Sequence, residues 1–212
     1  MQWSSAFESW DGTLYVSKDT PSATRDSLVM YLAKAEERNK QFWQGKEGKP
    51  KIIYVHTPEQ HARYAWPQAP ASVFYTPFQC IMIIGPEGID LDVMSHELCH
   101  TELYHRLGWW RREWQIPTWF DEGLAMQLDY RKEYNEAAYV DLLSRLDYFP
   151  DIKTKRTPKA FWETGLVDSR QHYILARHEV GQWLHTHQRT GLLNMIGQMV
   201  EHGRDFEELY GQ

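Results

Sequence analysis

The sequence predicts an α+β fold, with a small mixed sheet in the N-terminal half and mainly helices in the C-terminal half. Short runs rich in β-branched and aromatic residues lie before residue 86, whereas helical periodicity dominates from residue 118 onward. Strands followed by helices are typical of α+β proteins. The 212 residues carry no repeat, and this length favours one domain. We expect residues 1–212 to form that domain, with an α/β lobe of about 1–107 and a helical lobe of about 108–212.

The first elements are predicted by turn and cap signals. Residues 13–17 read as a short strand that follows the turn Asp11-Gly12. Thr20-Pro21 is a helix start, and apolar spacing continues that helix to about residue 44. A glycine-rich break then leads into a second strand over residues 51–56.

The next stretch leads to a central helix. Residues 57–77 carry four prolines and are expected to form a loop with one short strand around 72–75. The apolar run 80–85 is a strand bounded by turn residues. A helix is then expected from about residue 90 to residue 107, with Gly108 near its end.

The second half reads as helices joined by one linker. Pro117-Thr118 predicts a helix over roughly 118–146, and residues 147–159 form a polar, basic linker. Two or three helices should follow from about 171 to 210, interrupted at Gly191 and Gly203. A group of tryptophans is expected to pack in the helix hairpin rather than to line a substrate pocket: Trp109, Trp110, Trp114 and Trp119.

Composition excludes several classes of protein. The 23 Lys and Arg against 29 Asp and Glu give a net charge of −6, which argues against general binding to nucleic acid or anionic lipid. No apolar run reaches the length of a membrane span. Cys80 and Cys99 are expected to be buried thiols, although a single bridge is possible. Residues 1–5 lack the layout of a signal peptide; we expect a cytoplasmic protein if the chain is complete, and an exported or anchored one if a leader was removed.

The sequence His96-Glu97-Leu98-Cys99-His100 lies inside the central helix. Residues four apart share a helix face, so both imidazoles can reach one divalent metal ion. Zinc accepts imidazole nitrogen, and a catalytic zinc needs three protein ligands. Glu97 is then placed to polarise a water molecule in the open position.

A third ligand is needed to complete such a site. His105 lies about 140° further round the helix than His100, so it faces away. Glu122, near the start of the next predicted helix, is the better candidate because a helix hairpin would bring its carboxylate to the metal.

Together, the pentapeptide and the later segment Trp119-Phe120-Asp121-Glu122-Gly123-Leu124-Ala125 resemble the gluzincin zinc metallopeptidases. The resemblance is strongest over roughly 81–130. It implies a zincin-like fold with Zn²⁺ held by His96, His100 and Glu122, and Glu97 as general base. It also implies that residues 81–85 are similar to the edge strand along which this clan binds its peptide substrate.

A weaker resemblance covers residues 172–209, where the segment around Tyr173 is similar to the tyrosine-bearing helix of the clan. Tyr173 would then donate a hydrogen bond to the developing oxyanion. Arg177, one turn later on the same face, would bind a substrate carboxylate or carbonyl group, and a structural ion pair is the alternative role.

The sequence departs from the thermolysin pattern at Met126, which stands where an aspartate is expected four residues after the third ligand. Histidines that bind a metal usually donate their second N–H to a carboxylate or carbonyl. Asp129 and Asp121 are the candidates for this role.

Two functions follow from these residues. The first is a zinc-dependent metallopeptidase that hydrolyses peptide or protein substrates by a zinc-activated water with Glu97 as general base. The alternative is a catalytically silent zincin-like domain that serves as a binding or scaffold module.

Overall fold

The computed structural model describes residues 6–66, 68–146, 148, 150–162 and 166–211. The fold is α+β, with a small mixed sheet in the N-terminal half and helices in the C-terminal half, which confirms the predicted class. The chain forms two compact units, Met1–His105 and Arg106–Gln212. That they belong to a single zincin-like domain stays a prediction.

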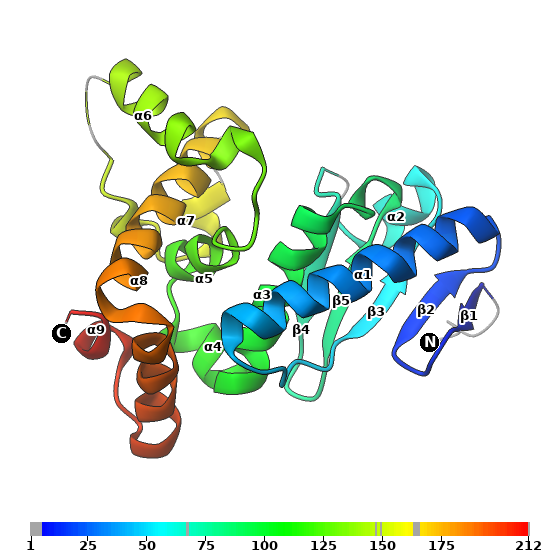
Figure 1. Ribbon diagram of the computed structural model, residues 1–212, viewed down its shortest axis with the longest axis horizontal. Helices are drawn as coiled ribbons and strands as arrows, with labels where there is room; N and C mark the ends of the chain where they lie inside the picture. The colour runs from blue at the N-terminus through cyan, green and yellow to red at the C-terminus, as the bar shows by residue number, and fades with distance from the viewer. Residues whose placement is uncertain (1–5, 67, 147, 149, 163–165, 212) are drawn as a thin grey trace. The chain divides into compact units, whose positions relative to one another are not determined.

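A five-stranded sheet forms the centre of the first unit (Figure 1). Its strands are β1 (Phe7–Ser9), β2 (Leu14–Ser17), β3 (Lys51–Tyr54), β4 (Ala71–Tyr75) and β5 (Cys80–Ile84), in the order β1-β2-β3-β5-β4. The pairs β2–β3 and β3–β5 are parallel, whereas β1 and β4 run antiparallel to their neighbours. The sheet is therefore mixed, as expected.

The edge strand of this sheet is not the one that the resemblance implies. Residues 81–84 belong to β5, which pairs with β3 on one side and β4 on the other. The chain turns back at Thr76, whose N–H and hydroxyl both donate to the Gln79 carbonyl. This hairpin covers β5 with β4, so the edge strand on this side of the sheet is β4, and β1 is the edge strand on the other side.

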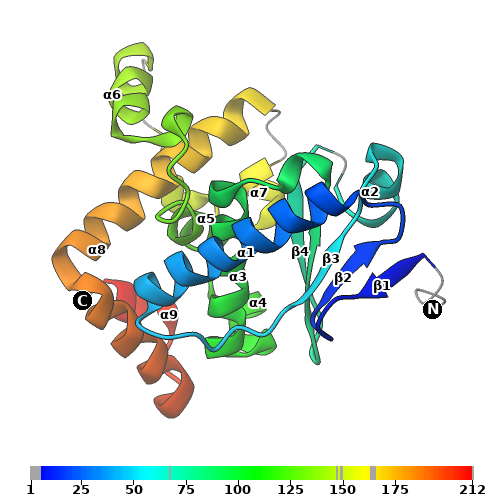
Figure 2. The ribbon, with the colours of Figure 1, turned by 45° about the vertical axis from the view of Figure 1, so that its right-hand side comes forward.

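Helices α1 (Ser22–Trp43) and α3 (Leu91–Leu107) cover one face of the sheet (Figures 1 and 2). Apolar side chains of both helices share one buried cluster with strand residues: Leu14, Val16, Leu28, Leu32, Ala35, Ile52, Tyr54, Ala71, Met82, Ile84, Val93, Met94 and Leu98. A smaller cluster on the other face includes Phe7, Ile53 and Ile83, with Tyr64 at the end of α2 (Pro58–Tyr64) packed against it. Burial on both faces explains the apolar run of β5.

Helix α2 and strand β1 are additions to the predicted elements. Thr57 caps α2 by accepting a hydrogen bond from the Gln60 N–H, and Pro58 stands in the first turn. Thr57-Pro58 thus makes the start that was expected of Thr20-Pro21. At α1 the N-cap residue is Pro21 and no side chain caps the helix, so the expected cap by Thr20 is wrong. The four prolines of residues 57–77 favoured a loop interpretation for α2. A short 3₁₀ turn, η1 (Pro86–Gly88), joins β5 to α3.

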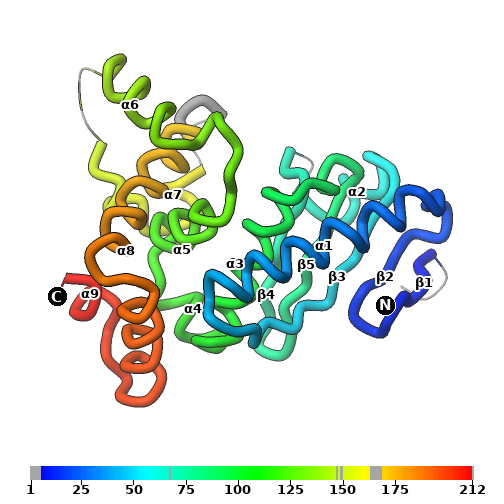
Figure 3. The backbone as a smooth tube through the Cα atoms, in the orientation of Figure 1, coloured from blue at the N-terminus to red at the C-terminus, as the bar shows by residue number. Residues whose placement is uncertain are grey.

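The second unit is helical (Figure 3). It contains α4 (Trp109–Gln115), α5 (Thr118–Ala125), η2 (Lys132–Tyr134), α6 (Glu136–Arg145), η3 (Ile152–Thr154), α7 (Pro158–Trp162), α8 (Leu166–His202) and α9 (Phe206–Tyr210). Residues 147 and 149 of the expected linker lie outside the described residues.

The predicted helix over 118–146 is wrong, because two helices separated by a 3₁₀ turn occupy this range. The Asp129 carboxylate accepts hydrogen bonds from the backbone N–H and side chain of Arg131, which competes with helical bonding. Asn135 then caps α6 through the Ala138 N–H.

Helix α8 is interrupted at a different residue than expected. Gln188 has φ 61° inside the helix, whereas Gly191 lies within it. Gly203, with φ 66°, follows the last helical residue as predicted.

The predicted packing of the tryptophans is partly wrong, and the predicted buried thiols are confirmed. Trp119 is buried, but Trp110 and Trp114 are 63% and 67% exposed, so the expected packing role is wrong for these two. Cys80 and Cys99 are buried thiols rather than a disulfide. Among the described residues, none of the helices combines the length and apolar character that crossing a bilayer requires.

Candidate metal centre

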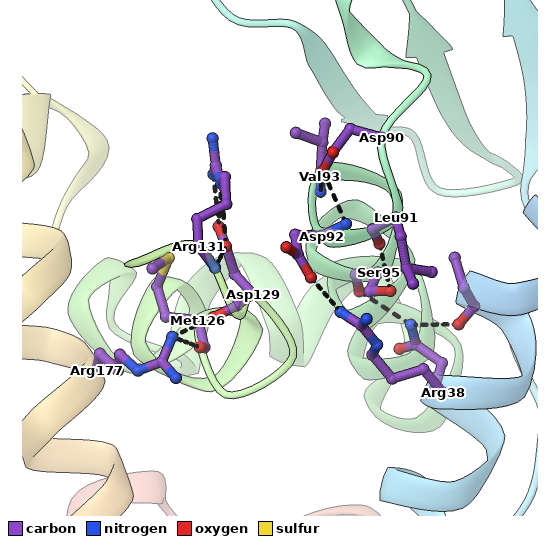
Figure 4. Close-up of polar contacts among 12 residues, drawn as sticks. Arg38, Asp90, Leu91, Asp92, Val93, Ser95, Met126, Asp129, Arg131 and Arg177 are labelled. Carbon is purple, nitrogen blue, oxygen red and sulfur yellow. Dashed lines mark hydrogen bonds and ion pairs between the residues drawn. The ribbon is translucent and has the colours of Figure 1, made fainter. Parts of the chain in front are cut away.

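The N-terminus of α3 is fixed by acidic side chains. The Asp90 carboxylate accepts hydrogen bonds from the N–H groups of Asp92 at 2.8 Å and Val93 at 3.1 Å, which satisfies donors that a helix leaves open at this end. Asp92 pairs with Arg38 of α1 at 2.5 Å (Figure 4). These contacts fix where the helix begins.

Further along, buried polar contacts join α3 to its own unit. The Asn39 amide donates to the Ser95 carbonyl at 2.9 Å. Glu102 is 3% exposed, and its carboxylate accepts the backbone N–H groups of Glu47 and Gly48. Hydrogen bonds to a buried carboxylate are strong, so Glu102 holds the loop before β3 against α3.

His96 and His100 are both buried on one face of α3. Their Nε2 atoms lie 3.2 Å apart, and roughly 3.3 Å is expected between two ligands of a tetrahedral zinc with bonds of about 2.05 Å. Two nitrogen lone pairs facing each other at this distance need a proton or a cation between them. Glu97 follows His96 and is half-buried.

His105 is bonded elsewhere, in agreement with its exclusion by helix geometry. Its Nδ1 lies 2.8 Å from the Thr101 carbonyl, and its Nε2 accepts the Lys49 N–H at 3.3 Å. Both ring nitrogens are therefore used in contacts with the backbone.

Glu122 belongs to α5, a helix of eight residues of which the seven from Trp119 to Ala125 are buried. Pro117 at the N-cap provides no side-chain hydrogen bond. Instead, the N–H groups of Thr118 and Trp119 donate to the carbonyls of Arg156 and Lys155, at 2.9 and 3.2 Å. The main chain of a distant segment thus caps the helix that carries Glu122.

Gly123 allows α5 to lie directly on α8. A Cβ atom at this position would come within 2.4 Å of the Ala176 carbonyl oxygen and 2.6 Å of the Val180 Cγ2 atom. Only a residue without a side chain permits this approach. The glycine of the motif therefore has a packing reason in this structure.

Donor atoms of His96, His100 and Glu122 all lie within 4.8 Å of one another. This group could hold a metal ion. Two imidazole nitrogens and one carboxylate oxygen are a donor set typical of catalytic zinc, which keeps a fourth position for water or substrate. The residues that the sequence predicted as metal ligands thus fit such an ion.

The two aspartates proposed to orient the histidines make other contacts. Asp121 is 3% exposed and accepts a hydrogen bond from Arg112 of α4. Asp129 is fully buried, and Arg131 lies 2.5 Å from its carboxylate (Figure 4). Their role toward His96 or His100 stays a prediction.

Arg177 and Tyr173 both lie on α8. One nitrogen of the Arg177 guanidinium donates to the carbonyls of Met126 and Asp129, which follow α5 (Figure 4). The Tyr173 hydroxyl accepts a hydrogen bond from the Trp162 indole at 3.0 Å, so its own proton must point elsewhere. Their roles in binding substrate and the oxyanion stay predictions.

Sequence analysis missed a cavity of about 130 Å³ in the second unit. Arg177, His178 and Gly181 line it from α8, together with Gln127 and Tyr139. The His178 ring stacks on Tyr139 with centroids 3.6 Å apart. The only signal in the sequence is the helical spacing of residues 174, 177, 178 and 181, which alone is equally typical of a packed face.

Comparison with models of protein families finds no match for this chain, and comparison with curated proteins also finds none. Arguments about function therefore rest on the residues and their arrangement.

Proposed function

We propose that this protein is a zinc-dependent metallopeptidase. One observation carries the proposal: the donor atoms of His96, His100 and Glu122 lie within 4.8 Å of one another. A glutamate, Glu97, directly follows the first of these histidines. A bound zinc ion supplies Lewis acidity, which polarises a substrate carbonyl and lowers the pKa of water to about 7.

In this proposal Glu97 moves the proton. Its carboxylate takes a proton from the attacking water as the water oxygen bonds to the peptide carbonyl carbon. The same carboxylate then returns that proton to the amine nitrogen as the C–N bond breaks. No covalent bond to the protein forms.

Tyr173 and strand β4 are the proposed substrate contacts. Because the Tyr173 oxygen already accepts the Trp162 indole N–H, its hydroxyl proton is directed to another acceptor, for which we propose the developing oxyanion. Strand β4 is one of the two edge strands of its sheet, and the open backbone groups of an edge strand can bind an extended peptide.

The test measures zinc content and cleavage of a mixed peptide library for the native protein, Glu97→Gln, and Glu37→Gln as the control. Glu37 is exposed on α1, so the control makes the same chemical change away from the site. We expect one zinc per chain in all three proteins, and cleavage that falls about 10²–10⁴-fold only in Glu97→Gln.

Two results would reject the proposal. A protein without zinc would refute the metal centre. Zinc binding with equally inert native and Glu97→Gln proteins would refute the peptidase activity and leave a metal-binding module.

A further inference from the structure

The C-terminal helix α9 contacts the helix that carries Glu122 through aromatic rings. Phe206 lies 4.8 Å from Phe120, and Tyr210 lies 5.2 Å from Trp119, measured between ring centroids. Trp119 and Phe120 are 1% and 0% exposed. These two residues stand just before Asp121 and Glu122, so α9 packs against the turn of α5 that leads to the third ligand.

A second contact joins α9 to the backbone that caps α5. Glu207 of α9 pairs with Arg156. The carbonyl of Arg156 accepts the Thr118 N–H at 2.9 Å, and the carbonyl of Lys155 accepts the Trp119 N–H. Because α5 has no side-chain cap, these carbonyls satisfy donors that its first turn leaves open.

A third contact holds α9 on α8. The Tyr210 hydroxyl donates to the Glu179 carboxylate at 2.9 Å, and the Trp183 indole donates to the Tyr210 carbonyl at 3.1 Å. Burial first, and then the nearby Glu179 carboxylate, raises the pKa of Tyr210, so the phenol stays a donor. Lys153, beside the capping segment, also pairs with Glu179 at 2.8 Å.

We propose that α9 is a positioning element for Glu122, in which Tyr210 and Glu207 hold the N-terminal turn of α5 and thereby set the affinity and geometry of the metal centre. The part that concerns the metal rests on the proposed function. The part that concerns α5 does not, because it is a statement about the order of residues 118–125.

The test compares full-length variants. Tyr210→Ala removes the ring and the hydroxyl, whereas Tyr210→Phe keeps the ring contacts with Trp119 and Phe120. Tyr139→Ala is the control for loss of an aromatic ring. Tyr139 of α6 stacks on His178 of α8, so this variant also removes a stacked ring. Hydrogen exchange of the α5 amides is measured first, in the metal-free proteins.

A second, milder pair of variants tests the capping contact. Glu207→Gln and Glu208→Gln change the same charge on the same short helix. Their carboxylates are similarly exposed, at 59% and 58%. Only Glu207 pairs with Arg156, whereas Glu208 pairs with Arg204.

We expect Tyr210→Ala to speed exchange of the α5 amides and to weaken zinc affinity about tenfold or more, as changes behind a metal ligand do. Tyr210→Phe should stay within about threefold of the native affinity, and Glu207→Gln should speed exchange more than Glu208→Gln. The absorption spectrum of bound Co²⁺ should change in Tyr210→Ala but not in Tyr139→Ala. If Tyr210→Ala does not fold, hydrogen exchange in Glu207→Gln and Glu208→Gln decides whether α9 holds α5.

Unchanged exchange of the α5 amides in folded Tyr210→Ala, or equal exchange in the Glu207 and Glu208 variants, would overturn the proposal. Faster exchange with unchanged zinc affinity would overturn its metal part. If the native protein binds no zinc, the proposed function fails, and hydrogen exchange still decides whether α9 holds α5.

Discussion

Helices α3 and α5 are held in place in opposite ways. Helix α3 has 17 residues and is capped by its own neighbour Asp90, with Asp92, Ser95 and Glu102 bonded to α1 and the adjoining loop. Helix α5 has eight residues and no side-chain cap. Its first N–H groups donate to carbonyls of residues 155 and 156, and aromatic rings of α9 cover its first turn. The local sequence thus specifies α3, whereas remote segments complete α5.

The strongest test of this comparison removes Glu122, the candidate metal ligand on α5. We expect Glu122→Ala to lower zinc affinity by more than about 100-fold, because a catalytic zinc site needs three protein ligands. Loss of a ligand should cost more than loss of a residue that only hydrogen-bonds to a ligand. Titration against a competing chelator measures the change, and Glu133→Ala in the exposed η2 turn is the control. Unchanged zinc stoichiometry after dialysis against a mild chelator would reject Glu122 as a ligand.

Crowding at Gly123 tests how closely α5 lies on α8. The Cβ atom of Gly123→Ala would meet the Ala176 carbonyl at 2.4 Å, and such overpacking costs about 1–3 kcal/mol. In contrast, no atom of a packing neighbour among the described residues lies within 4 Å of a Cβ at Gly197, so Gly197→Ala should stabilise helix α8 by about 0.5–1 kcal/mol. Urea unfolding measures both, and two variants of equal stability would contradict the close packing of α5.

Removing the cap of α3 tests the other side of the comparison. Asp90→Ala loses two hydrogen bonds from N–H groups and should cost about 1 kcal/mol. Thr118→Ala, at the first residue of α5, should change stability by about 0.5 kcal/mol or less, because main-chain carbonyls serve this helix instead. Thermal unfolding measures the two changes. A larger loss in Thr118→Ala would reverse the comparison.

The smallest expected effect is a pH dependence of stability that arises from His61 in the first unit. His61 is 6% exposed, and a Cβ at Gly85, just after β5, would lie 2.8 Å from its ring. Burial lowers the pKa of His61 below its ordinary value of 6.5, although Glu87 acts in the opposite direction. The unfolded chain therefore binds a proton near pH 6.5 that the folded protein binds only at lower pH. Stability present above pH 6.5 is lost as the pH falls below it.

The variant His61→Gln should reduce this loss of stability. Urea unfolding of the native and variant proteins between pH 7.5 and 5 measures the difference. Parallel curves for the two proteins would show that another group titrates.

The two helices also mark how far sequence alone predicts this protein. The expected range 90–107 for the central helix is nearly the observed Leu91–Leu107, since its cap, its periodicity and its end lie within its own sequence. For α5 the sequence identified Glu122 and the start of the helix, but not its end at Ala125. That end depends on two contacts. The Asp129 carboxylate accepts hydrogen bonds from Arg131, and Arg177 of α8 donates to the carbonyls of Met126 and Asp129.

The candidate metal ligands His96 and His100 were accessible to sequence analysis because motif spacing determines which side chains share a helix face, and Glu122 because it lies near the start of the next predicted helix. The identity of the edge strand next to β5 was not accessible to sequence analysis. It depends on which of β4 and β5 pairs with β3, and both strands carry residues suitable for either position. The cavity beside Arg177 was also inaccessible, because it is formed by segments distant in sequence.

The packing of α9 on α5 has a consequence for the order of events during biosynthesis. Residues 155 and 156 and the rings of Phe206 and Tyr210 leave the ribosome after residues 118–120, which they contact. While translation continues, the segment with His96 and His100 can complete its local contacts, but α5 still lacks its main-chain cap and aromatic cover. A nascent chain that has emerged only to residue 150 should therefore contain an ordered histidine helix and a loosely held Glu122.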